Sequence, residues 1–298
     1  MRNKLHELSV YLKQTKATYF LYAVLLFLFI IVILSIRLKK IMEFQELSLP
    51  LSNVVYLSLI GFFFNNFLPT SVAGDFVKAY YTARYTNRTM ESYTSIIVDR
   101  IFGIFAFVFI TVIALFLADR NIKKPIVTNS IVSLVIISLC LILVLSNDNF
   151  TKRLHKLLEK IKLLTISSTL QHFFKTVSRY NKNYRIIFFA FYTSVLSQII
   201  STLVVAILAK GLSIEIPLML LFLTLPIITT VSMLPSLNGL GIRESAYVFL
   251  LGNYIGKEKA FALSILWLGI ILLVSFFGGI AYLFKDFLLN KKGEVNVR

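Results

Sequence analysis

The chain has 298 residues, of which 57% are hydrophobic and 15% are charged, and its formal net charge is +17. A soluble domain has roughly 45–50% apolar and about 25% charged residues, and a chain this apolar could not cover its surface with polar groups in water. Composition and a mean hydropathy of +0.81 exclude a soluble globular protein and predict an integral membrane protein. The basic residues are spread among short loops, which argues against nucleic acid as a partner.

Seven apolar runs are predicted to be membrane-spanning helices, because a span needs about 20 mostly apolar residues. They are residues 18–36, 51–68, 101–118, 126–146, 186–209, 216–234 and 260–284. An eighth run, 245–255, is shorter and is expected to be a half-span, a re-entrant segment or a tilted short crossing. We therefore predict an all-α fold, a polytopic membrane helix bundle of seven or eight spans in one domain over residues 1–298.

Basic residues predict the orientation of this bundle. The segment 147–185 carries nine lysines and arginines, against three between the third and fourth spans, so the positive-inside rule assigns it to the cytoplasm. Two helical hairpins separate it from the N-terminus, which is then cytoplasmic too. Residues 154–164 predict an amphipathic helix, either a reader of anionic lipid or a connector resting at the surface. We expect a multi-pass protein of a bacterial plasma membrane.

An internal repeat is indicated at an offset of about 166 residues. Leu68 and Leu234 lie 166 residues apart (234 − 68), each is followed by proline, and a glycine-bearing break follows both. Paired interrupted helices at corresponding positions point to a transporter's substrate site, because broken helices expose backbone groups and dipole ends to a ligand. The predicted pseudo-repeats are residues 18–118 and 186–284, linked by the span 126–146 and the segment 147–185.

The two breaks and the charges near them supply the candidate substrate-binding residues. Adjacent amides in an aromatic run and a charged pair at the start of a span are costly in hydrocarbon unless they face protein or water. Arg100 could alternatively extend to the lipid headgroups. In an empty groove, Asp99 and Glu244 are expected to pair with the arginines. The candidates are Asn65, Asn66, Asp75, Lys78, Asp99, Arg100, Asn238, Gly239, Gly241, Arg243 and Glu244.

Three motifs occur along the chain: Asn66-Phe67-Leu68-Pro69…Gly74-Asp75…Lys78…Tyr80, then Ser95…Asp99-Arg100…Gly103, then Pro235…Gly239…Gly241…Arg243-Glu244…Tyr247. In this order they resemble the flippase-like membrane region of lysylphosphatidylglycerol synthases. The resemblance implies a protein that moves lipids with polar headgroups across the bilayer. Two positions depart from the pattern: Ala73 stands where glycine is common, and Lys78 where arginine is common. Residues 285–298 alone follow the last span, so we expect a stand-alone member without the soluble aminoacyl-transferase domain.

The functional prediction is a lipid flippase or flippase-like translocator of phospho- or glycolipids that does not hydrolyse ATP. One cysteine, Cys140, and three histidines without ligand spacing give no metal or disulfide motif, and we expect no enzymatic activity, catalytic residue, cofactor or metal. Expected partners are membrane lipids with anionic or phosphate-bearing headgroups and a separate lipid-modifying enzyme. The alternatives are a membrane subunit of glycosyl or aminoacyl transfer to lipid, a secondary transporter of a small solute, and a structural anchor.

Overall fold

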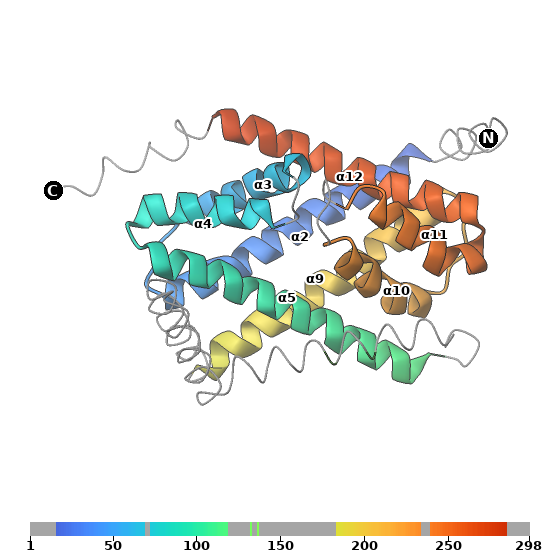
Figure 1. The fold of residues 1–298 in the computed structure, drawn as a ribbon, viewed down its shortest axis with the longest axis horizontal. Helices are drawn as coiled ribbons and strands as arrows, with labels where there is room; N and C mark the ends of the chain where they lie inside the picture. Colours follow the sequence, from blue (N-terminus) through green and yellow to red (C-terminus); the bar gives the residue numbers. More distant parts are fainter. Residues whose placement is uncertain are drawn as a thin grey trace, which may run out of the picture.

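The computed structural model describes residues 16–68, 72–118, 132, 136, 183–233 and 239–284. This part of the chain contains eight long or medium α-helices and no β-strand (Figure 1), which confirms the all-α prediction for these residues. The helices are α2 (Ala17–Phe44), α3 (Leu51–Phe67), α4 (Ala73–Thr86), α5 (Thr89–Leu117), α9 (Tyr184–Gly211), α10 (Leu218–Val231), α11 (Ile242–Ile255) and α12 (Lys257–Leu283).

Four of these helices, α2, α5, α9 and α12, are long and apolar enough to cross a membrane. They have 27 to 29 residues, or about 40 Å of helix, against a hydrocarbon core of about 30 Å. The runs predicted as spans at 51–68 and 216–234 form the shorter helices α3 and α10, of 17 and 14 residues. Seven or eight crossings stays a prediction, because most of the predicted span 126–146 and most of the segment 147–185 lie outside the described residues.

Both halves of the chain show the same order of helices and the same turn geometry. Each half has a long helix, two short helices and a second long helix. After the first long helix the backbone turns through a left-handed residue, Glu46 (φ 60°) or Ser213 (φ 55°), and a proline, Pro50 or Pro217, precedes the short helix. Glu46 and Ser213 are 167 residues apart (213 − 46), as are Pro50 and Pro217 (217 − 50). The internal repeat itself stays a prediction.

Helix packing builds the bundle around α2 and α9, which contact each other more than any other pair. In Figure 1, α2 and α9 run side by side, with α3 and α4 towards the left of the view and α10 and α11 towards the right. The main core joins α2, α9, α10, α11 and α12 through residues such as Ile31, Leu208 and Leu220. Helix α3 lies in backbone contact with α12, since a Cβ atom at Gly278 would be 2.1 Å from the carbonyl oxygen of Leu59.

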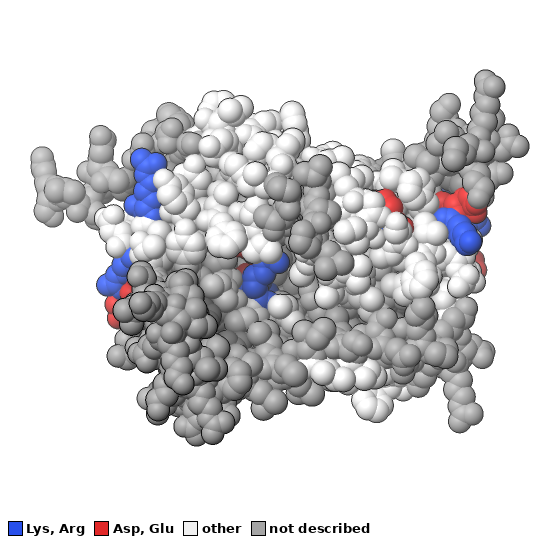
Figure 2. Space-filling model, viewed as in Figure 1, with Lys and Arg blue, Asp and Glu red and all other residues white. Residues whose placement is uncertain are grey.

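Large apolar side chains cover much of the outer surface. A water-soluble protein would bury such residues, so the pattern is that of a surface facing lipid. Figure 2 shows Lys, Arg, Asp and Glu mostly near the two ends of the long axis, with one small charged group near the middle of this face. More than half exposed are Leu21, Phe29, Phe116, Phe188, Phe249 and Phe276. Multi-pass membrane insertion is therefore supported by the structure as well as by composition.

Candidate functional site

A cavity of about 360 Å³ lies within the bundle, and all eight described helices contribute side chains to its wall. This volume is at the lower end of the roughly 300–1,000 Å³ typical of small-ligand sites. One part of the wall is aromatic. Phe27 lies edge-to-face with Phe62 and with Trp267, at ring-centroid distances of 5.8 and 5.6 Å. The cavity is therefore of the size of a small-ligand site, and other parts of its wall carry aliphatic, charged and neutral polar side chains.

The first charged cluster joins α4 to α5. Asp75 lies in the first turn of α4, where the helix dipole favours a carboxylate, and is 7% exposed. Lys78, one turn later, places Nζ 2.6 Å from Asp75 Oδ1, and Nε of Arg100 on α5 donates a hydrogen bond to Oδ2. One buried carboxylate thus serves two cations, so the cluster keeps a formal charge of +1.

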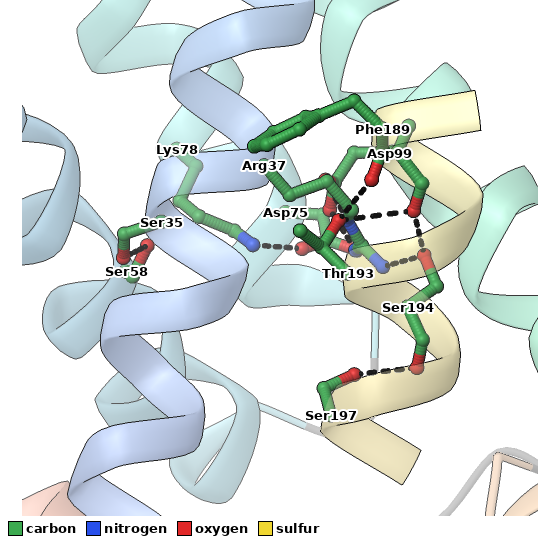
Figure 3. A network of polar contacts seen from close by, with 11 residues as sticks. Ser35, Arg37, Ser58, Asp75, Lys78, Asp99, Phe189, Thr193, Ser194 and Ser197 are labelled. Atoms are coloured by element: carbon green, nitrogen blue, oxygen red, sulfur yellow. Dashed lines mark hydrogen bonds and ion pairs between the residues drawn. The ribbon is translucent and has the colours of Figure 1, made fainter. Parts of the chain in front are cut away.

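The second charged cluster joins the long helices α2, α5 and α9, as Figure 3 shows. Arg37 Nε and Nη2 donate to the two carboxylate oxygens of Asp99, both at 2.7 Å, and Nη1 donates to Ser194 Oγ at 2.6 Å. Such two-pronged pairs are among the strongest hydrogen-bonded contacts in proteins. The expectation that Asp99 pairs with an arginine of the groove motifs was wrong, because its partner is Arg37.

Asp99 and Arg100 lie well inside α5 and not at the start of a span. The helix begins at Thr89, 12 residues before the apolar run at 101 (101 − 89). Neighbouring helix positions point about 100° apart, so Asp99 faces α2 while Arg100 reaches α4. The two charges therefore belong to different clusters.

The first break is positioned by close contact between α3 and α4. A Cβ atom at Gly74 would be 1.9 Å from the carbonyl oxygen of Gly61, so the backbones touch at these two glycines. Asn65 Oδ1 accepts a hydrogen bond from the Gly74 N–H at 2.7 Å and so ties the end of α3 to the start of α4. Asn66 instead donates to the carbonyl of Phe62 within its own helix, at 3.1 Å.

The second break ends at the start of α11. Gly239 and Gly241 adopt φ values of +76° and +80°, a region that favours glycine. Glu244 Oε2 accepts a hydrogen bond from the Gly241 N–H at 2.6 Å, which caps the helix. This oxygen of Glu244 therefore serves the main chain, and the expected pairing of Glu244 with an arginine stays a prediction. Arg243 and Tyr247, one turn apart on α11, line the cavity.

The structure brings most of the predicted site residues to this one cavity. Asn65, Asp75, Lys78, Asp99, Arg100 and Arg243 line it, whereas the lining of the described chain does not include Asn66, Gly239, Gly241 and Glu244. Asn238 lies outside the described residues. The flanks of both breaks therefore meet at the same site.

Arg37 and Gln198, which also line the cavity, were missed by sequence reasoning, and Tyr247, which lines it too, was part of the third motif but not a candidate site residue. Arg37 directly follows the apolar run 18–36 and resembles a charge that flanks a span. The signal for its burial was the continued apolar face of the helix, with Leu38 and Met42 also buried.

Comparison with known proteins identifies the family of the chain. A family described as the lysylphosphatidylglycerol synthase TM region matches residues 3–279, which include both charged clusters and the flanks of both breaks. Searches of curated proteins and of solved structures found no match. Because the match covers nearly the whole chain, the protein belongs to the lysylphosphatidylglycerol synthase transmembrane-region family.

Proposed function

We propose that the protein is a flippase-like translocator that moves lipids with anionic phosphate- or glycan-bearing headgroups across the plasma membrane without ATP hydrolysis. The observation that carries the proposal is an excess of positive charge in the cavity. The described lining has four cations and two carboxylates, a formal surplus of +2 (4 − 2): Arg37, Lys78, Arg100 and Arg243 against Asp75 and Asp99. Membership of a family of lipid synthase membrane regions supports a lipid-related role.

The energetic cost of these charges favours a translocator over a structural anchor. A charged side chain in the middle of a membrane helix costs roughly 2.5–3.5 kcal/mol on insertion scales. An anchor gains nothing in return for that cost. A protein that desolvates an anionic headgroup does gain, because cations in a low-dielectric cavity offset the lost hydration and their N–H groups replace hydrogen bonds from water.

In the proposed mechanism, the cations that Asp75 holds are transferred to the entering headgroup. Its carboxylate holds Lys78 and Arg100 in place when no headgroup is present. A phosphate offers the same kind of acceptor oxygens, so an entering headgroup takes over these donors from Asp75, with Arg243 contributing from α11. The cavity of about 360 Å³ holds the headgroup, while the acyl or prenyl tails stay in the lipid.

The test is lipid movement in vesicles that contain purified protein at matched density. The probe is phosphatidylglycerol with a fluorescent label on one acyl chain, and external dithionite reports the label that reaches the outer leaflet. We expect Arg243→Gln to slow movement by about tenfold or more, the equivalent of about 1.4 kcal/mol. Arg88→Gln is the matched control, because Arg88 pairs with exposed Glu46 away from the cavity.

The outcomes separate the competing functions. Movement no faster than in protein-free vesicles overturns the proposal. An Arg243→Gln protein that moves lipid at the unmutated rate contradicts the cavity mechanism. Uptake of a soluble solute that depends on an ion gradient would favour a secondary transporter, and lipid modification by a co-purified transferase would favour a subunit of a transfer system.

A further inference from the structure

The short helices α3, α4, α10 and α11 form two hairpins, and Figure 1 shows that the hairpins enter the bundle from opposite ends. In the first hairpin, Arg88 Nη1 lies 2.9 Å from Glu46 Oε2. The turn before α3 therefore contacts the residue that follows the α4 segment and precedes α5. The first hairpin begins and ends at one end of the bundle, which we call the Arg88 end.

The second hairpin begins and ends at the opposite end. Ser194, in the N-terminal half of α9, binds Arg37, in the C-terminal half of α2, so α9 runs antiparallel to α2 and carries the chain away from the Arg88 end. Helix α10 starts from there. Helix α11 returns to the same place, because only Gly256 separates it from α12, and α12 finishes beside α3, where Tyr56 donates a hydrogen bond to Ala281.

The helices of both hairpins are shorter than a membrane is thick. Helix α3 has 17 residues, and α4, α10 and α11 have 14 each. These lengths correspond to about 26 and 21 Å of helix, against about 30 Å of hydrocarbon. A hairpin whose open end lies at one interface therefore turns back inside the hydrocarbon core.

The tips of the two hairpins meet at the cavity. Asn65 and Asp75 flank the first break, Met233 and Arg243 flank the second, and all four side chains line the same cavity. Non-helical backbone at membrane depth is tolerated where it is buried in protein or lines a cavity. Both breaks therefore have the surroundings that a position inside the membrane requires.

Main-chain N–H groups at both tips are satisfied by side chains of the same hairpin. Asn65 Oδ1 accepts from the Gly74 N–H at 2.7 Å, and Glu244 Oε2 accepts from the Gly241 N–H at 2.6 Å. In hydrocarbon, where water is absent, a backbone group needs such an internal partner. At an aqueous interface, water would serve these groups, so the two side-chain partners favour tips that lie within the membrane.

Basic residues assign the two ends to the two sides of the membrane. Helix α9 begins at Tyr184, at the Arg88 end, and the segment 147–185, with nine lysines and arginines, leads into it. Residues 1–16 precede α2 at the opposite end and carry four. The positive-inside rule therefore places the Arg88 end in the cytoplasm.

We infer that α3–α4 and α10–α11 are re-entrant hairpins that enter the membrane from opposite sides, α3–α4 from the cytoplasm and α10–α11 from outside. The N-terminus is then outside, in contrast to the expectation from the sequence. Helices α2, α5, α9 and α12, with the predicted span 126–146, make five crossings. The cavity lies between the two interfaces, bordered by one hairpin tip from each side. This arrangement concerns the path of the chain and does not rest on the proposed function.

Single cysteines test the arrangement in protein whose Cys140 is replaced by alanine. The positions Lys16, Ser48, Thr89 and Glu215 are all exposed, and a membrane-impermeant maleimide is added to spheroplasts before and after permeabilisation. We expect Lys16→Cys and Glu215→Cys to be labelled before permeabilisation, and Ser48→Cys and Thr89→Cys only after it.

Two of these positions discriminate, and two are matched controls. If the runs 18–36 and 51–68 both crossed the membrane from a cytoplasmic N-terminus, Lys16 would be inside and Ser48 outside. Both arrangements place Thr89 inside and Glu215 outside, so these two cysteines verify that the spheroplasts are intact and correctly oriented.

A cross-link provides a second measurement on purified full-length protein. A short bis-maleimide should join the pair Glu46→Cys/Arg88→Cys, because these residues contact each other at the Arg88 end. The pair Glu46→Cys/Glu215→Cys is the control and should stay unlinked, because its cysteines lie at opposite ends. Mass spectrometry of the linked peptides reads the result.

Label at Ser48→Cys before permeabilisation, or at Lys16→Cys only after it, would overturn the inference. A link between positions 46 and 215 in place of the link between 46 and 88 would do the same. Each cysteine reports separately, so the test stays decisive if one variant fails to fold. These experiments do not measure lipid movement, so their outcome is distinct from that of the test of the proposed function.

Discussion

Arg37 on α2 and Asp99 on α5 form a two-pronged ion pair with N–O distances of 2.7 Å, and their side chains are 6% and 12% exposed. Ser194 on α9 accepts the third hydrogen bond of the guanidinium. Three of the four helices long enough to cross a membrane therefore meet at one arginine. The pair has a structural role in addition to lining the cavity.

Removing one member of this pair should destabilise the protein strongly. We expect Arg37→Leu to lower the free energy of unfolding by about 3–5 kcal/mol, because it leaves the Asp99 carboxylate buried without its cation. The double variant Arg37→Leu/Asp99→Leu should recover most of this loss. Thermal unfolding in detergent measures both, with Arg88→Gln as a surface control that changes stability by about 1 kcal/mol or less. A single variant as stable as this control would contradict the prediction.

The contact between Gly61 and Gly74 predicts a sharp difference between two glycine substitutions. Gly74→Ala places a methyl group 1.9 Å from a backbone oxygen, so α3 and α4 must separate, at a cost of about 1–3 kcal/mol or more. Gly103→Ala meets no atom closer than 4.0 Å and should be neutral or stabilising, since alanine favours helix by about 1 kcal/mol. Melting temperatures of the two proteins decide the point, and equal values would refute it.

Asp75 is expected to compete with the headgroup for its cations. Asp75→Asn keeps the shape of the side chain but removes the charge that holds Lys78 and Arg100. Affinity for dihexanoyl phosphatidylglycerol, read from Trp267 fluorescence, should rise about fivefold, which corresponds to about 1 kcal/mol. Glu46→Gln, which alters an exposed acidic residue, serves as the control. Weaker binding by Asp75→Asn would show that the carboxylate assists the headgroup.

Topology can be checked with single cysteines after Cys140 is replaced by alanine. The basic segment 147–185 predicts that Thr165→Cys is cytoplasmic. Lysines 285, 291 and 292 follow the last helix and favour a cytoplasmic C-terminus, as eight crossings or the re-entrant arrangement with five crossings requires. A membrane-impermeant maleimide should therefore label Thr165→Cys and Asn290→Cys from the same side. Labelling from opposite sides would mean seven crossings.

The sequence predicted the all-α fold, the family and six residues of the cavity wall, because charges and amides in apolar runs are costly and stand out. The sequence could not predict which charged side chains form ion pairs. Asp99 and Arg100 are neighbours in sequence, but the 100° step of a helix turns them toward different partners. Arg37 becomes the partner of Asp99 only through the packing of α2 against α5.

The neutral polar side chains that α9 contributes to the cavity were harder to foresee for a different reason. Ser194, Gln198 and Ser201 recur at helical spacing on one face of α9, but uncharged polar residues are tolerated in a long apolar helix. Only the packing of the other helices shows that these side chains line a cavity. The helix-capping role of Glu244 was not foreseen because a carboxylate beside an arginine suggests an ion pair, whereas its position at the third residue of α11 suits a helix cap.

The contact of α3 with α12 limits how the cavity can open to the two sides of the membrane. Gly278 touches the backbone at Leu59, and about one helical turn away the hydroxyl of Tyr56 donates a hydrogen bond to the carbonyl of Ala281. Sliding of these two helices past each other would break both contacts, so we expect α3 and α12 to move together. If the proposed translocation is correct, we expect the cavity to open where its wall is held by ion pairs that a headgroup can replace, between α4 and α5.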